Sequence, residues 1–370
     1  MLNFSNPKYS HRPDYVFLIC VAILVIFGLI MLSSASSDLG KLKYNDTYYY
    51  LKHQITYGLT LGIIGFLITS FLYYRNLQKI AFLLLAFNII LLVLVFTPLG
   101  TPHNKDASRW IEIGPISLQP AELLKISFII YLAAWLSNVK KKRQNFYEGF
   151  LPFLTILCLI AFLVFFQPAT TTFIIVMLSA IIIYFLSGVK LSYMAGIIIL
   201  AIMGISLLIY LTTYRYERIM SYFDKEAKTQ TIGYQLEKSL IAIGSGGAYG
   251  RGFGKSTAKY THLPEAIGDS IFAIIAEELG FIGSMFTILI FTVLTSRGFQ
   301  IAKKSGDRFG YLTAFGLTSI IAIQAFTHIA SVSGLIPITG MPLPFISYGG
   351  TSLAVFLTMT GIIANISKYT

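Results

Sequence analysis

Apolar residues fill long continuous stretches of this chain, and short polar segments separate them. Several stretches are about 20 residues long, which is the length an α-helix needs to cross the hydrocarbon core of a bilayer. The short alternating segments typical of outer-membrane barrels do not occur in the sequence. The pattern predicts an all-α, polytopic integral membrane protein with about ten transmembrane helices, at residues 14–34, 52–73, 78–98, 118–137, 149–166, 169–187, 191–211, 268–295, 309–332 and 343–366.

The composition agrees with this class. The chain has 370 residues, of which 55% are hydrophobic and 12% are charged. That charged fraction is about half the value usual for soluble proteins. Because we see no internal repeat and no low-complexity linker, we expect one membrane domain over residues 1–370.

The net charge of +12 follows the predicted topology. An even number of spans places both termini on one side of the membrane. If that side is cytoplasmic, the inner segments hold fourteen lysines and arginines, and the short outer loops hold five. The positive-inside rule therefore favours cytoplasmic termini, and the excess charge does not indicate a nucleic-acid partner.

Residues 212–267 form a connection too long for an ordinary turn, and we expect a large, partly ordered loop outside the cell. Its glycine run, GSGGAYGRGFGKS at 244–256, fails the P-loop spacing because Tyr249 stands where the first glycine belongs. Two interpretations remain open. The backbone N–H groups could approach a phosphate beside Arg251, Lys255 and Lys259, or the run could be a flexible connector.

The stretch LPEAIGDSIFAIIAEELG, residues 263–280, holds four of the 16 acidic residues of the chain. Asp269 precedes the apolar run, where it could be a helix N-cap or a functional acid. Glu277 and Glu278 lie two or more turns further along the helix, and we expect packing or ion-pair roles for them.

The stretch ASRWIEIGPISLQPAELLK, residues 107–125, leads into the fourth span. Glu122 and Lys125 are three residues apart and share a helix face. Ionisable residues within a membrane are costly and usually paired, so a structural ion pair and a functional site are both open. Arg109 with Trp110 suggests an anchor at the membrane interface.

The stretch GLIPITGMPLPFISYGGTSL, residues 334–353, collects prolines and glycines at the entry to the last span. Irregular backbone survives at membrane depth only where protein buries it or where it lines a cavity. We expect it to shape a site, with a re-entrant turn that has no chemical role as the alternative. His262 and His328 have no second ligand at metal-binding spacing.

Taken together, the stretches at 107–125, 263–280 and 334–353, with GYQLEKSLIAIGSGGAYGRGFGKSTAK around the glycine run, resemble the SEDS family, which includes FtsW, RodA and SpoVE. They look most like its FtsW branch. The resemblance covers most of the chain in order. It implies a peptidoglycan glycosyltransferase in the bacterial cytoplasmic membrane, which polymerises lipid II outside the membrane for cell division or cell-wall growth. It also implies a class B penicillin-binding transpeptidase as partner, together with other divisome or elongation membrane proteins.

The resemblance places the catalytic aspartate of the family on Asp269, which we expect to act as a general base in an inverting displacement of undecaprenyl pyrophosphate. We expect the substrate-binding residues to be Glu122, Lys125, Arg109, Arg251, Lys255, Lys259, Ser347 and Tyr348. No cofactor is certain, and a divalent cation (Mg or Mn) held by carboxylates and the pyrophosphate is left open. A lipid II flippase and a non-catalytic divisome scaffold are the alternatives to the enzyme.

The chain departs from the family pattern at three places. Ile267-Gly268-Asp269 replaces the usual His-Thr-Asp, and His328 stands where asparagine is common. Ala169, in QPATTT, replaces the acid of the usual QPDLGT motif. If the acid at this position serves ion or substrate binding in other members, this chain is altered there.

Overall fold

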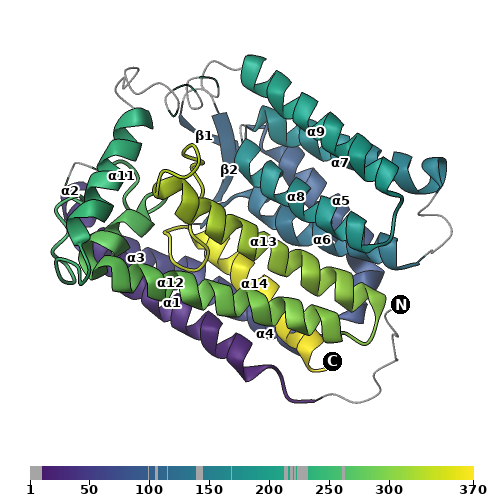
Figure 1. Ribbon diagram of the computed structural model, residues 1–370, viewed down its shortest axis with the longest axis horizontal. Helices are drawn as coiled ribbons and strands as arrows, with labels where there is room; N and C mark the ends of the chain where they lie inside the picture. Colours follow the sequence, from purple (N-terminus) through teal and green to yellow (C-terminus); the bar gives the residue numbers. More distant parts are fainter. Residues whose placement is uncertain are drawn as a thin grey trace.

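The protein was analysed as a computed structural model, which describes residues 11–98, 100–104, 107–114, 116–138, 145–167, 169–211, 216, 220, 222, 232–260 and 263–370. Helices account for most of the chain in this description, as predicted (Figure 1). The helices are α1 (Tyr15–Ala35), α2 (Ser37–Tyr44), α3 (Tyr49–His53), η1 (Gln54–Leu59), α4 (Thr60–Phe71), α5 (Arg75–Leu94), α6 (Pro120–Asn138), η3 (Phe146–Phe150), α7 (Leu151–Phe166), α8 (Thr170–Leu186), α9 (Leu191–Leu211), α11 (Ile232–Gly246), α12 (Ile271–Lys304), α13 (Arg308–Val332) and α14 (Gly350–Ser367).

Within the described residues, eight helical segments are long and apolar enough to cross a membrane. Two shorter apolar helices, Thr170–Leu186 and Leu191–Gly204, lie where the sixth and seventh spans were predicted. The polytopic all-α class is therefore confirmed, and the count of ten spans stays a prediction. The predicted outer loop at 212–267 contains helix α11, whereas most of residues 212–231 lie outside the described part of the chain.

The centre of the bundle is formed by α13, α14 and α6, which are buried over most of their length. Helix α14 packs on α4, and α13 packs on α6, α8 and α12. Helix α1 lies along the outer side of α12, while α7 and α9 form the opposite flank (Figure 1). The apolar side chains on the outside of the bundle form the surface that faces lipid in a membrane protein.

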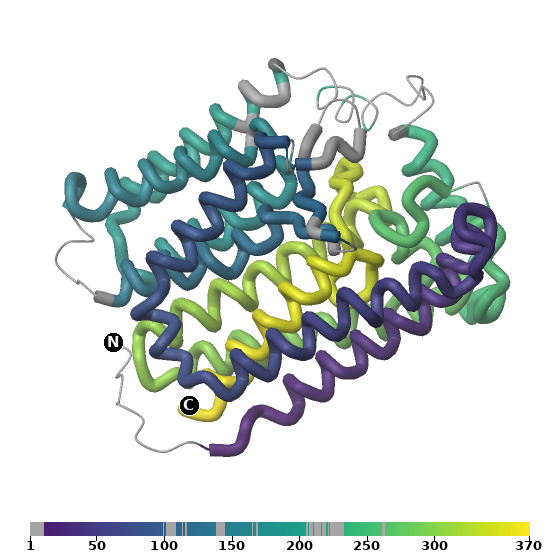
Figure 2. The backbone as a smooth tube through the Cα atoms, turned by 180° about the vertical axis from the view of Figure 1, so that it is seen from behind, coloured from purple at the N-terminus to yellow at the C-terminus, as the bar shows by residue number. Residues whose placement is uncertain are grey.

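The two ends of the bundle differ in what they carry. The backbone N–H of His11 donates to the carbonyl of Lys368 at 2.6 Å, so the start of α1 and the end of α14 are neighbours. At this end Arg75 pairs with Asp307 at 2.5 Å. Helices α2, α3 and α11 lie at the opposite end, as both views show (Figure 2).

A small antiparallel sheet between α5 and α6 was not predicted. Its strands are β1 (Gly100–Asn104), β2 (Ala107–Ile113) and β3 (Ile116–Leu118), in the order β1-β2-β3. Ile111 pairs with Leu118 across the β2–β3 turn, where Gly114 has a φ of 63°. The expected interfacial anchor at Arg109 and Trp110 is therefore part of strand β2. The signal was present, because Gly-Pro between two short apolar alternations is typical of a hairpin turn.

Candidate functional site

Asp269 lies in a turn at the end of the bundle opposite the termini. The turn covers residues 263–270 and closes on itself, since the N–H of Ser270 donates to the carbonyl of Glu265 at 3.1 Å. Glu265 itself adopts a left-handed φ of 49°. Helix α12 begins at Ile271 with Ser270 as its N-cap residue. Asp269 is half-buried and precedes the cap position, so the N-cap interpretation is wrong.

The segment before α14 holds this turn in place. The Ser347 hydroxyl donates to the carbonyl of Gly268 at 2.7 Å, and it accepts the N–H of Leu343 at 2.7 Å. The N–H of Tyr348 donates to the carbonyl of Ile267 at 2.8 Å. The bonds to Gly268 and Ile267 end within two residues of Asp269, so this segment holds the backbone that carries Asp269.

The two residues expected to bind substrate in this segment differ in access. Ser347 is buried and its hydroxyl is used by the backbone, which favours a positioning role. Tyr348 is half-buried, and its hydroxyl lies 3.0 Å from Nδ1 of His53. Burial raises the pKa of the Tyr348 phenol well above its ordinary value, so the group stays neutral at physiological pH. A neutral phenol can both donate and accept hydrogen bonds.

Glu122 and Lys125 form a buried ion pair on α6. Lys125 Nζ lies 2.6 Å from Glu122 Oε1, and the two residues are 1% and 3% exposed. The ammonium also donates to Oε1 of Gln324, on α13, at 2.7 Å. These contacts favour the structural interpretation of the pair over direct substrate binding.

Gln324 connects that pair to the proline-rich segment before α14, residues 341–347. Its Nε2 donates to the carbonyl of Pro342 at 2.9 Å, and one turn later His328 Nδ1 lies 2.6 Å from the carbonyl of Met341. A chain of hydrogen bonds thus runs from Lys125 through Gln324 and the 341–347 segment to the Asp269 turn. The site-shaping interpretation of this segment is supported. Gln324 was missed, although Gln and His four residues apart in an apolar helix were a visible signal.

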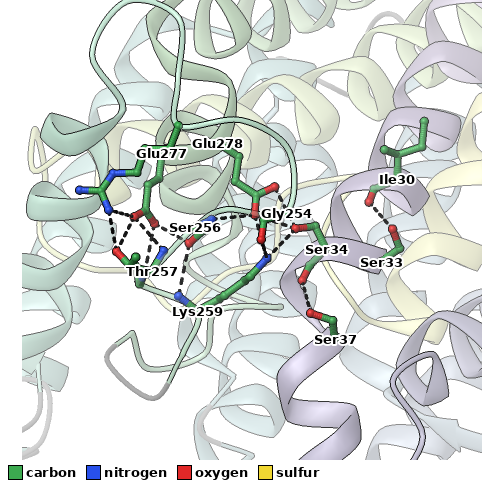
Figure 3. A network of polar contacts seen from close by, with 12 residues as sticks. Ile30, Ser33, Ser34, Ser37, Gly254, Ser256, Thr257, Lys259, Glu277 and Glu278 are labelled. Atoms are coloured by element: carbon green, nitrogen blue, oxygen red, sulfur yellow. Dashed lines mark hydrogen bonds and ion pairs between the residues drawn. The ribbon is translucent and has the colours of Figure 1, made fainter.

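Glu278 lies in a second buried network that joins three separate segments (Figure 3). Its carboxylate accepts from the Ser34 hydroxyl of α1 at 2.6 Å and lies 3.1 Å from Nζ of Lys259. The same ammonium donates to the carbonyl of Gly254 at 2.7 Å. Lys259 is only 3% exposed, so this geometry does not favour its expected contact with a substrate phosphate.

Glu277 binds the loop after α11 from the other side. It accepts the N–H groups of Thr257 at 3.0 Å and Ala258 at 3.2 Å, as well as the Ser256 hydroxyl (Figure 3). Arg251 Nη1 lies 3.3 Å from its Oε1. The expected ion-pair roles of Glu277 and Glu278 are therefore confirmed.

Part of the glycine run packs against the backbone of α12. Helix α12 breaks at Gly280, whose φ is 68°. There the carbonyls of Glu277 and Glu278 accept the N–H groups of Arg251 at 2.9 Å and Gly252 at 3.0 Å. A Cβ at Gly250 would lie 2.2 Å from the Glu278 carbonyl oxygen. The glycines thus allow close backbone packing at the break, and these N–H groups are not available to a phosphate.

The remaining cations that we expected to bind substrate differ in their exposure to solvent. Lys255 is exposed, and the Arg251 side chain is 40% exposed. Arg109 is half-buried in β2. His262 lies outside the described residues. Among the described residues, no group of three or more His, Cys, Asp or Glu side chains could hold a metal ion, and the divalent cation stays untested.

The position of the altered QPATTT motif is clear. Ala169 occupies the N-cap position of α8 and is buried, and the preceding Gln167 donates to the carbonyl of Leu92 at 2.7 Å. An acid at this position would lie where the first N–H groups of α8 need a partner.

Comparison with known proteins was made by sequence and by fold. Stage V sporulation protein E of Bacillus subtilis (strain 168) is 36% identical over 96% of this chain and 97% of its own length. The probable peptidoglycan glycosyltransferase FtsW of Geobacter sp. (strain M18) is 35% identical over 96% of both chains. These relatives cover the whole bundle and not only the motifs.

Solved structures share the same fold. A chain from a peptidoglycan synthase complex, studied for the coordination of polymerization and crosslinking, has a TM-score of 0.79 at 23% identity, over 97% of this chain and 99% of that chain. The rod shape determining protein RodA of Thermus thermophilus gives 0.70 at 23% identity, over 97% of this chain and 98% of its own. Residues 14–370 match the FtsW/RodA/SpoVE family, described as cell cycle proteins, and the chain belongs to that family.

Proposed function

We propose that the protein is a peptidoglycan glycosyltransferase that polymerises lipid II into glycan strands. The relatives that carry this activity in their names span nearly the full chain. The observation that carries the proposal is the placement of Asp269 in a turn fixed by Ser347 and Tyr348, at the end of the bundle opposite the termini.

The chemistry asked of Asp269 is proton removal. The 4-hydroxyl of one sugar attacks C1 of a second sugar, and the bond from C1 to the pyrophosphate oxygen breaks with inversion. A neutral hydroxyl is a weak nucleophile, and a positioned carboxylate that takes its proton contributes about 10²–10⁴ in rate. The half-buried Asp269 has the access that this role needs.

The leaving pyrophosphate needs positive charge nearby. Lys255 and Arg251 support this role because both are exposed on the loop that packs against α12. Arg109 is a further candidate on β2. Lys125 and Lys259 are held in buried pairs, and we assign them the positioning of the site.

The proposed setting is the bacterial cytoplasmic membrane, with both termini inside and Asp269 at the outer face. The neighbouring ends of α1 and α14 and the positive-inside distribution support this orientation. We also propose a class B penicillin-binding transpeptidase as partner, since a protein of the same fold occurs in a complex that couples polymerization with crosslinking.

The test is a polymerisation assay with the purified protein, a class B transpeptidase and lipid II. We expect glycan products on a gel that resolves chain length. A protein that forms no glycan with its partner present, but moves fluorescent lipid II across vesicles, would establish the flippase instead. A protein that does neither would establish the scaffold.

A further inference from the structure

Six aromatic rings gather at the same end of the bundle as the Asp269 turn, five on the segment that joins α1 to α4 and one directly before α14. Each ring contacts at least one other ring of the group. We call this group the aromatic platform, and its members are Tyr44, Tyr49, Tyr50, His53, Tyr57 and Tyr348.

One edge of the platform is open to solvent. Tyr44 and Tyr49 are stacked with ring centroids 3.6 Å apart and planes 9° apart, and Tyr44 is 50% exposed. Tyr50 lies beneath them, perpendicular to both rings, and is 8% exposed. A buried ring thus supports an accessible pair, which holds the outer rings in fixed orientations.

The other edge of the platform reaches the proposed active site. Tyr50 meets the Tyr348 ring edge to face at 5.1 Å. The Tyr348 N–H binds the carbonyl of Ile267, two residues before Asp269. The platform and the turn are therefore one continuous structure.

Polar groups meet at one edge of the platform, between Tyr348 and His53. The Tyr348 hydroxyl and His53 Nδ1 lie 3.0 Å apart. His53 and Tyr57 also line a cavity of about 140 Å³, whose remaining lining is mostly apolar and includes Leu61, Leu123 and Val355. Flat apolar faces beside hydroxyl and imidazole groups suit a sugar, whose C–H faces pack on rings while its hydroxyls form hydrogen bonds.

We propose that the aromatic platform is a saccharide-binding site that holds the glycan strand beside Asp269 between successive additions. This inference rests on the proposed function, since only a polymerising enzyme keeps a growing strand at its active site. Tyr44 and Tyr49 form the contact surface, and Tyr50 and Tyr348 support it. None of these tyrosines takes part in the chemical step.

The competing role is anchoring at the membrane interface, where tyrosines are common. The chain offers a matched control for it. At the opposite end, Tyr369 contacts Tyr73 at 4.8 Å and Tyr74 at 5.8 Å in a similar cluster. If these rings anchor the protein, substitutions in either cluster should impair it. If the platform binds saccharide, only substitutions in the platform should.

The experiment compares the Tyr44→Ala/Tyr49→Ala double variant with Tyr369→Ala. Lipid II is polymerised with the transpeptidase partner present, and both initial rate and glycan length are measured. We expect glycans about threefold to tenfold shorter from the double variant, with an initial rate near that of the wild type. Tyr369→Ala should leave both unchanged, and Tyr49→Trp should restore length in the Tyr44→Ala background.

A direct binding measurement separates this inference from the proposed function. Saturation-transfer NMR with a soluble GlcNAc oligomer should show contact with the wild type and a weaker signal with the double variant, even if no glycan is made. Unchanged glycan length and unchanged NMR signal in a folded double variant would overturn the platform. Equal losses in the double variant and in Tyr369→Ala would assign the rings to anchoring.

Discussion

The Ser347 hydroxyl lies 2.7 Å from the carbonyl oxygen of Gly268, the residue directly before Asp269. Together with the bond from the Tyr348 N–H to the carbonyl of Ile267, this bond connects the segment before α14 to the turn that carries the proposed base. The same hydroxyl accepts the N–H of Leu343 at 2.7 Å, so both of its bonding directions are set by the backbone. Ser347 is therefore a positioning residue for Asp269.

Replacing Ser347 with alanine removes both bonds and loosens the turn. We expect a fall in kcat of about tenfold to a hundredfold, since small misplacements of a catalytic group are costly, with little change in KM. Steady-state kinetics on lipid II checks this. Ser284→Ala is the control, because its hydroxyl bonds only within α12, to the carbonyl of Gly280. Equal kinetic effects of the two variants would contradict the positioning role.

The Glu122–Lys125 pair should show strong thermodynamic coupling. Lys125→Met leaves the Glu122 carboxylate buried and unpaired, at a cost of about 3–5 kcal/mol of stability. The double variant Glu122→Leu/Lys125→Met removes both charges, so it should be more stable than Lys125→Met alone. Thermal unfolding in detergent measures this.

The exposed pair of Lys52 and Asp46 is the control for the Glu122 and Lys125 variants. Lys52→Met should leave the unfolding midpoint near that of the wild type, because water already solvates both charges. Additive losses at Glu122 and Lys125 would show that the two groups act independently.

Replacing Lys259 and replacing Lys255, which lie on the same loop, should have different effects: the first on stability and the second on substrate binding. Lys259→Met leaves Glu278 without its cation in a buried site, so we expect a large loss of stability. Lys255→Met should keep wild-type stability and raise the KM for lipid II on the order of threefold to tenfold, because it removes an exposed charge near the pyrophosphate. A stable Lys259→Met protein with a raised KM would return Lys259 to substrate binding.

Ala169 offers a test of what its missing carboxylate does. Asp or Asn at this N-cap position can accept an N–H of the first turn of α8, and each should raise stability by about 1 kcal/mol. Thermal unfolding measures the effect of the cap on stability, and the polymerisation assay measures the effect of the charge on the rate. A gain in rate with Ala169→Asp but not with Ala169→Asn would show that the acid itself serves the reaction.

The sequence predicted the fold well where the pattern was repetitive. Helix α13, for example, lies at Arg308–Val332 against the predicted 309–332. The last helix begins at Gly350 and not at 343, because the prolines before it remove N–H donors that a helix needs. The β2–β3 hairpin was missed because its short strands adjoin a much stronger apolar signal.

The site was predicted less completely, for a physical reason. Asp269 stood out because it precedes an apolar run, and Glu278 stood out because it lies within one. Their partners could not be identified, since Ser34 and Ser347 come from segments far apart in the chain, and Lys259 comes from the loop before the turn. The role of the glycine run depends on the break at Gly280, which local sequence does not reveal.

The most direct test is the rate of lipid II polymerisation by Asp269→Asn, measured with the transpeptidase partner and compared with the wild type. The amide keeps the size of the side chain and cannot take up the proton, so we predict a loss of about 10²–10⁴ in rate with the protein still folded. Polymerisation by Asp269→Asn at the wild-type rate would contradict the assignment of Asp269 as the base.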